Sequence, residues 1–80
     1  MSNSTTKKGN KNLIGTNIRN IRLKMDMSQR DFAEFLQCHG LDMDKNMITR
    51  IETKERKIYD YEIRKLCKIL KISYDTLFND

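Results

Sequence analysis

The sequence predicts an all-α fold, a compact domain of five short helices. Apolar residues recur at steps of three and four along most of the chain, and no stretch alternates cleanly between apolar and polar residues as a half-buried strand does. The chain of 80 residues has room for one small core and contains no proline. Short polar segments separate the periodic stretches, so we expect the helices to pack directly on one another.

Residues 1–12 contain Ser, Thr, Asn, Gly and Lys, and Met1 is their only apolar residue. Such a segment cannot bury enough surface to order itself, so we predict a flexible basic arm here and a domain over residues 13–80. The first helix is expected over 13–25, with Asn12 as its cap. Its core face consists of Ile14, Ile18, Ile21 and Met25, which step by four, three and four.

The second helix is expected over 28–37, where Ser28 is a suitable N-cap and Asp31 follows three residues later. Its inner face is formed by Phe32, Ala33 and Leu36. The third helix, 44–53, begins with Asp44 as cap and buries Met47, Ile48 and Ile51. The fourth, 59–70, is expected to turn Tyr59, Ile63, Leu66, Cys67 and Leu70 inward. A short fifth helix is capped by Ser73 and buries Leu77 and Phe78.

Composition excludes several classes of protein. No segment reaches the roughly 20 apolar residues that a membrane span needs, and no apolar run follows the first lysines as in a signal peptide. Without a secretion signal, Cys38 and Cys67 are best interpreted as free thiols in the cytoplasm. One histidine, no paired carboxylates at a plausible cleft and no glycine-rich phosphate loop argue against an enzyme. The net charge of +5 is compatible with a polyanionic partner.

The stretch "LQCHGLDMDKN", residues 36–46, resembles a metal site at first sight. Cys38 and His39 are adjacent, however, which is poor geometry for two zinc ligands, and a calcium loop would need glycine at Met47 and glutamate at Thr53. We therefore predict a turn and no metal or cofactor. Gly40 allows the bend, Leu41 or Met43 fills the core, and Asp44 starts the third helix. His39 could reach a phosphate or face water, and we favour water.

The outer face of the third helix suggests a function. At about 100° per residue, five polar residues share an arc of roughly 140° and the apolar residues lie opposite. The five are Lys45, Asn46, Thr49, Arg50 and Thr53. Arginine can pair with guanine, asparagine with adenine, and threonine can contact a thymine methyl or a phosphate. An ordinary solvated face is the alternative, but it usually mixes both charge signs. Lys54, Arg56 and Lys57 follow in a basic loop suited to phosphate.

The whole pattern resembles the Xre family of phage-repressor and Cro-like helix-turn-helix domains. The resemblance covers residues 13–78 and rests on "IGTNIRNIRLKMDMSQRDFAEFL", "MITRIE" and "YDYEIRKLCKILKISYDTLF". It implies a lambda-repressor-like fold that binds double-stranded DNA. Lys45, Asn46, Thr49 and Arg50 would contact bases in the major groove. Phosphate contacts would come from Gln29, Thr53, Lys54, Arg56 and Lys57.

The resemblance also implies an internal ion pair between Arg22 and Glu52. Several positions depart from the family pattern. Asp26 and Lys54 stand where glycine is usual, so we expect the turn after the third helix to differ, and Tyr59 replaces a capping Ser or Thr. Between Leu36 and Asp44 the chain is about five residues longer than the tightest members, as in a subgroup with a lengthened turn.

From this resemblance we expect a transcriptional repressor that binds an inverted-repeat operator as a homodimer in the cytoplasm, with no small-molecule ligand. Helix five and the C-terminus are the expected dimer region, and no sensing or catalytic domain is expected after them. The basic arm, with Lys7, Lys8 and Lys11, could add DNA contacts or be a disordered end. An antitoxin or anti-regulator that uses the same fold to bind a protein remains the alternative function.

Overall fold

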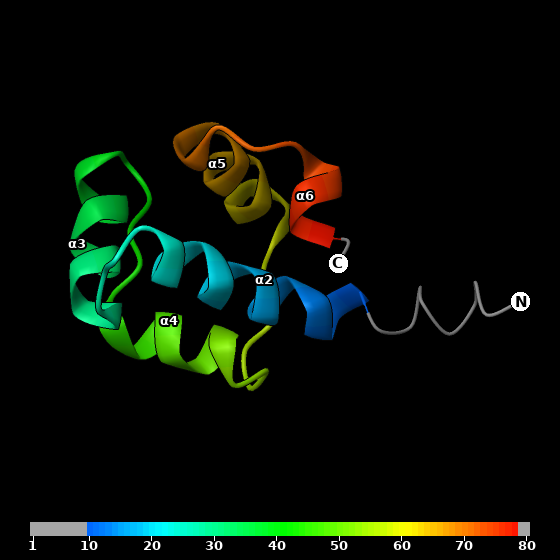
Figure 1. Ribbon diagram of the computed structural model, residues 1–80, viewed down its shortest axis with the longest axis horizontal. Coiled ribbons are helices and arrows are strands. Elements are labelled where there is room, and N and C mark those ends of the chain that lie inside the picture. The colour runs from blue at the N-terminus through cyan, green and yellow to red at the C-terminus, as the bar shows by residue number, and fades with distance from the viewer. Residues whose placement is uncertain (1–9, 79–80) are drawn as a thin grey trace, which may run out of the picture.

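The computed structural model describes the backbone of residues 10–78 and the side chains of residues 13–78, and this part forms helices only. The helices are α2 (Asn10–Lys24), α3 (Gln29–Cys38), α4 (Lys45–Glu52), α5 (Asp60–Leu70) and α6 (Tyr74–Phe78). Figure 1 shows α2 crossing the molecule, with α4 on one side and α5 and α6 on the other. The predicted all-α fold is therefore confirmed.

The first described helix begins earlier than the sequence suggests. Helix α2 starts at Asn10, so Asn12 lies within the helix and the prediction that it is the cap is wrong. Residues 10–12 contain no helix-breaking residue, and the helix can therefore extend almost one turn beyond its first core residues. The rest of the predicted arm, residues 1–9, lies outside the described residues.

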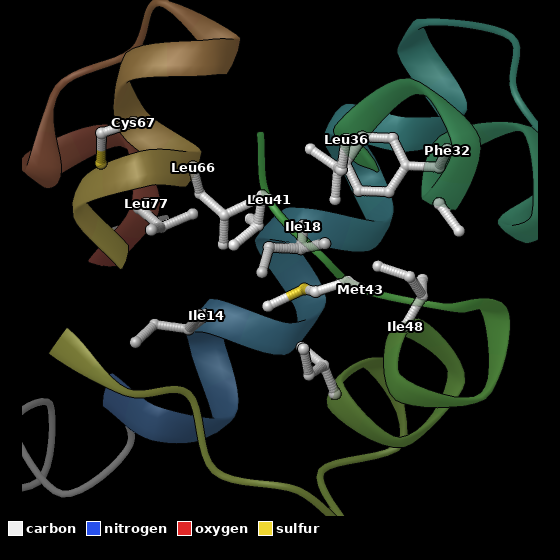
Figure 2. Close-up of a cluster of buried hydrophobic side chains, with 12 residues drawn as sticks. Ile14, Ile18, Phe32, Leu36, Leu41, Met43, Ile48, Leu66, Cys67 and Leu77 are labelled. Atoms are coloured by element: carbon white, nitrogen blue, oxygen red, sulfur yellow. The ribbon is translucent and has the colours of Figure 1, made fainter. Parts of the chain in front are cut away.

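The core is built around α2, which contacts both α4 and α6, while α3 packs on α4. Figure 2 shows apolar side chains from every described helix and from the α3–α4 turn meeting in one cluster. Its members are Ile14, Ile18, Phe32, Ala33, Leu36, Leu41, Met43, Ile48, Ile51, Leu66, Cys67 and Leu77. Ile21, Met25, Met47, Ile63, Leu70 and Phe78, which the helical pattern also turns inward, are half-buried against it.

Helices α2 and α4 approach each other closely at Gly15. A Cβ atom built on this residue would lie 2.4 Å from the carbonyl oxygen of Ile51, inside any normal contact distance. Only glycine lets the two backbones meet at this separation. The crossing fixes how α4 sits on the rest of the domain.

Helix ends use the signals that the sequence carries. The Ser28 hydroxyl accepts from the Asp31 N–H at 3.0 Å, and the Ser73 hydroxyl accepts from the Thr76 N–H at 3.2 Å, as predicted for both caps. Asp26, after α2, has φ 59°, the left-handed conformation that aspartate tolerates. Lys71, at the end of α5, has φ 58°, and lysine does not tolerate the left-handed conformation as aspartate does. Lysine at this position carries a conformational cost that glycine would remove.

The prediction that Tyr59 faces the core is wrong. Tyr59 is the N-cap of α5, and its side chain is 58% exposed. The helical period does not apply before the first helical residue, so its ring is free to leave the face that Leu66 and Cys67 share. Those two residues are buried as predicted. Cys67 is a free thiol whose pKa burial raises, and Cys38 is a free thiol exposed at the end of α3.

Candidate nucleic-acid interface

Helix α4 begins at an aspartate cap. The Asp44 Oδ1 atom accepts a hydrogen bond from the Met47 N–H at 2.8 Å, as the sequence predicts. This satisfies one of the donors that a helix N-terminus leaves unpaired. Ile48 and Ile51 are buried against α2, so the opposite side of α4 points away from the core. The apolar period thus fixes which face of the helix a partner can reach.

The outward face of α4 carries the predicted base-contacting residues. Lys45, Asn46 and Arg50 are exposed, and Thr49 is half-buried. The lysine and the arginine offer hydrogen-bond donors only, while asparagine offers a donor and an acceptor. Acidic residues are absent from this arc, because Glu52 turns inward. The arrangement can therefore present donors and positive charge to an anionic partner.

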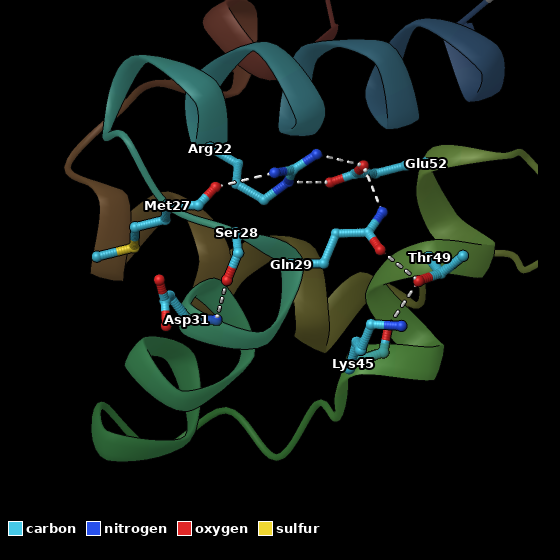
Figure 3. A network of polar contacts seen from close by, with 8 residues as sticks. All are labelled: Arg22, Met27, Ser28, Gln29, Asp31, Lys45, Thr49 and Glu52. Carbon is cyan, nitrogen blue, oxygen red and sulfur yellow. Dashed lines mark hydrogen bonds and ion pairs between the residues drawn. The ribbon is translucent and has the colours of Figure 1, made fainter.

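Glu52 holds α4 to α2 through a buried ion pair, which the sequence also predicts. Arg22 donates from Nε to Glu52 Oε2 at 2.7 Å and from Nη2 to Glu52 Oε1 at 3.0 Å, with both side chains less than 10% exposed. These hydrogen bonds raise the pKa of the Arg22 guanidinium. Its Nη1 atom also donates to the Met27 carbonyl at 2.9 Å, which secures the segment before α3. Figure 3 shows the guanidinium lying between these two acceptors.

Gln29 joins this ion pair to the outer face of α4. Its Nε2 atom donates to Glu52 Oε1 at 3.0 Å, and its Oε1 atom accepts from the Thr49 hydroxyl at 2.7 Å. The same hydroxyl lies 3.0 Å from the Lys45 carbonyl oxygen. Figure 3 shows the Gln29 side chain extending from the start of α3 toward α4. The side chain expected at phosphate is thus also part of an internal network.

The loop after α4 retains two exposed lysines, Lys54 and Lys57. Lys54 has φ 69°, so this turn takes the left-handed conformation typical of glycine despite the substitution. Thr53, exposed at the C-cap of α4, donates from its hydroxyl to the Arg50 carbonyl at 3.3 Å. Thr53, Lys54 and Lys57 follow directly after α4, so they could contact the same polyanion as the outward face of that helix.

Arg56 has a different environment. Sequence reasoning places it among the phosphate contacts, whereas both of its terminal nitrogens donate to Glu62, at 3.1 Å and 2.9 Å. The Glu62 side chain is 3% exposed and also accepts from the Tyr59 N–H at 3.0 Å. Burial alone would raise the pKa of Glu62, but these hydrogen bonds outweigh it and the pKa lies below its ordinary value. The pair fastens the loop to α5.

Residues 18–77 match a family model described as helix-turn-helix. The chain belongs to the helix-turn-helix family. This is the family of Xre, Cro and lambda-repressor-like proteins, which are DNA-binding regulators and not enzymes. No curated protein matches the chain, and no solved structure does either. The matched residues include both α3 and α4.

The turn of this helix-turn-helix spans the residues between Cys38 and Lys45. Gly40 has φ 94°, and the buried Leu41 and Met43 both fill the core, where the sequence predicts one or the other. Gln37 donates from Nε2 to the Met43 carbonyl at 2.8 Å, and Lys65 donates to the Gly40 carbonyl at 2.8 Å. The lengthened turn is therefore held at several points.

His39 is exposed, as favoured from the sequence, and its ring packs on Phe35 with centroids 4.5 Å apart. No group of three or more His, Cys, Asp or Glu side chains suited to a metal occurs among the residues that the structure describes. Among the described helices, none is long and apolar enough to cross a membrane.

Sequence reasoning misses two residues of this region. Arg30, exposed in the first turn of α3, lines a shallow hollow with Asp44, Lys45 and Asn46, so it lies beside the outward face of α4. Its position next to Gln29 is the signal that could have found it. Glu62 is the second, and its place three residues after the N-cap of α5 is the usual place for an acid that returns to the helix start.

Proposed function

We propose that this protein is a transcriptional repressor that binds a specific double-stranded DNA operator with α4 in the major groove. The observation that carries the proposal is the outward face of α4, where Lys45, Asn46 and Arg50 are exposed and the one acid of the helix, Glu52, is buried. Side chains of these types pair with guanine and adenine edges. Binding to a site that overlaps a promoter would exclude the polymerase.

Phosphate contacts in this proposal come from Gln29, Thr53, Lys54 and Lys57, with Arg30 added beside them. All except the half-buried Gln29 are exposed, and the basic residues contribute to the net charge of +5. Arg56 is left out, because Glu62 already occupies its guanidinium. We propose that Arg56 stabilises the loop that carries Lys54 and Lys57, through its ion pair with Glu62.

The operator is proposed to be an inverted repeat bound by a homodimer, with half-sites about one helical turn apart. Helix α6 offers a surface for the second copy, since Tyr74 is 47% exposed there and α6 lies across α2 from α4 in Figure 1. A dimer formed on that side would leave both recognition helices accessible. With DNA as its partner, the protein is proposed to act in the cytoplasm, at the nucleoid.

A second candidate function is protein binding. Tyr59 and Tyr61 are 58% and 55% exposed, their rings lie parallel with centroids 6.5 Å apart, and the Arg56 guanidinium lies 5.5 Å from the Tyr59 ring centroid. Tyrosine and arginine are enriched in protein interfaces, so this surface favours an antitoxin or anti-regulator role for the same fold.

Selection from a randomised duplex library tests the proposal. We expect recovery of a short inverted repeat that survives excess random competitor, with affinity that falls steeply as salt is raised. Arg50→Ala should reduce the preference for the selected site over random DNA, whereas Lys57→Ala should weaken binding to both alike. If the protein recovers no common sequence, or if Arg50→Ala leaves the preference intact, the proposed reading role of α4 is wrong.

A further inference from the structure

The amide of Gln29 can take only one orientation. Both oxygens of the Glu52 side chain accept hydrogen bonds from the Arg22 guanidinium. Gln29 Nε2 adds a third donor at 3.0 Å from Glu52 Oε1. Turning the amide over would place the Gln29 carbonyl oxygen against that carboxylate, with two acceptors facing each other and no proton between them. The buried ion pair therefore decides which end of the amide faces α4.

This orientation in turn fixes the hydroxyl proton of Thr49. The atom that faces Thr49 Oγ1, at 2.7 Å, is the Gln29 carbonyl oxygen, which can only accept. The other neighbour of the hydroxyl is the Lys45 carbonyl oxygen at 3.0 Å, which also only accepts. A threonine hydroxyl has a single proton, so that proton points inward. Among the described side chains of residues 13–78 and the backbone of residues 10–78, no group donates a hydrogen bond to Thr49 Oγ1, so the lone pairs of this atom have no partner there.

We propose that Thr49 acts toward DNA as a hydrogen-bond acceptor only, and that Gln29, the nearer of the two acceptors of its proton at 2.7 Å, is the positioning residue that holds this proton inward. The inference rests on the proposed function, in which α4 enters the major groove. The groups that an acceptor can contact there are the exocyclic amino groups, N6 of adenine and N4 of cytosine. Guanine O6, thymine O4 and the purine N7 atoms need a donor, and so do phosphate oxygens.

The surrounding residues give this acceptor a distinct part in recognition. Lys45 and Arg50, on the same outward arc, can only donate, which suits guanine. Thr49 adds the complementary group between them and makes the helix sensitive to an amino group at one base pair. The bases are not contacted in this scheme by Arg22, Glu52 or Gln29. These residues nevertheless determine which base the protein prefers at the pair that Thr49 contacts.

Base analogues in the selected operator test the inference. The base pair to examine is the one whose selected identity changes between the natural protein and Thr49→Val, which keeps the shape and loses the hydroxyl. At that pair, adenine is replaced by purine, or cytosine by pyrimidin-2-one, and each change deletes only the amino group. In parallel, the purine of the pair is replaced by its 7-deaza form, which deletes an acceptor.

We expect amino-group deletion to weaken the natural protein by about 5- to 10-fold, the share of one neutral hydrogen bond, and to leave Thr49→Val unaffected. The 7-deaza change should leave the affinity of the natural protein and that of Thr49→Val unchanged. Gln29→Met, which keeps the length of the side chain but provides no acceptor, should reduce the penalty for amino-group deletion.

The opposite pattern overturns the inference. If the 7-deaza change weakens the natural protein and amino-group deletion does not, Thr49 donates to DNA while the proposed function stands. If no base pair distinguishes Thr49→Val, Thr49 does not contact bases and the inference is wrong again. Failure to select any sequence would instead contradict the proposed function. In that event NMR of the free protein still tests the proton direction, since a Thr49 hydroxyl proton that exchanges as fast in the natural protein as in Gln29→Met is not held by Gln29.

Discussion

Replacing Gly15 by alanine would test the close contact between α2 and α4. The new methyl group would lie 2.4 Å from the Ile51 carbonyl oxygen, and contacts below 3.0 Å are essentially never seen. The obstructing atom belongs to the backbone of α4, so no side-chain rotation can relieve the contact. Helices α2 and α4 must therefore separate by about 0.6 Å or more at this point.

Two opposing terms set the size of the effect. Alanine is a better helix former than glycine by about 1 kcal/mol. Overpacking usually costs about 1 to 3 kcal/mol, and a contact with a rigid carbonyl belongs at the upper end. We therefore expect a net loss of about 2 kcal/mol in the free energy of unfolding, which corresponds to a fall in Tm of roughly 8 to 15 °C for a domain of this size.

Thermal and urea unfolding, followed by circular dichroism at the helical band, would measure the change. Asn20→Ala, at an exposed position of the same helix, is the matched control and should raise stability by a few tenths of a kcal/mol, because alanine has the higher helix propensity. A Gly15→Ala variant more stable than the natural protein would refute the close crossing, since only the favourable propensity term would then be acting.

Three further predictions concern charged residues. Glu52→Ala leaves a buried guanidinium unpaired and should lower the free energy of unfolding by about 3 kcal/mol, so an unchanged melting curve would reject the ion pair. Lys54→Gly relieves a left-handed lysine and should add about 1 kcal/mol in urea unfolding, whereas Lys68→Gly within α5 should remove about as much; equal effects would contradict the assigned backbone. Burial raises and hydrogen bonding lowers the pKa of Glu62, and the net shift is downward. The contribution of Glu62 to the free energy of unfolding is therefore present in full above the ordinary carboxyl pKa. It is lost as pH falls through the pKa that Glu62 has in the folded protein. Urea midpoints of the natural protein and Glu62→Gln should converge in acid, and parallel curves would exclude this ionisation.

Much of the fold follows from local signals in the sequence. The three- and four-residue spacing of Ile14, Ile18 and Ile21 places one face of α2 against the core, and the caps at Ser28 and Asp44 mark where helices begin. These signals act within a few residues, so they can be recognised without knowledge of the partner helix. The resemblance to a known family added the ion pair between Arg22 and Glu52, which spacing alone does not give.

The parts that the sequence did not predict depend on distant or irregular geometry. Glu62 is buried only because Arg56, six residues earlier, folds back over it from an irregular loop. Tyr59 lies at a helical spacing from the core residues of α5, but it precedes the first residue of the helix. Its side chain therefore does not follow the direction that the helical period predicts. Gln29 carries no local sign that its amide will bridge Glu52 and Thr49, because the bridge exists only after α3 and α4 have packed.

The lengthened turn has a consequence for how this domain can change over time. Leu41 and Met43 anchor it from within. The Met43 carbonyl accepts a hydrogen bond from Gln37 of α3, and the Gly40 carbonyl accepts one from Lys65 of α5, so the turn is held on both sides of the exposed tip at Asp42. Residues inserted at that tip can loop outward from the two anchors and need not move α4. The number of residues in the turn can therefore drift among relatives while the surface that a partner meets stays the same.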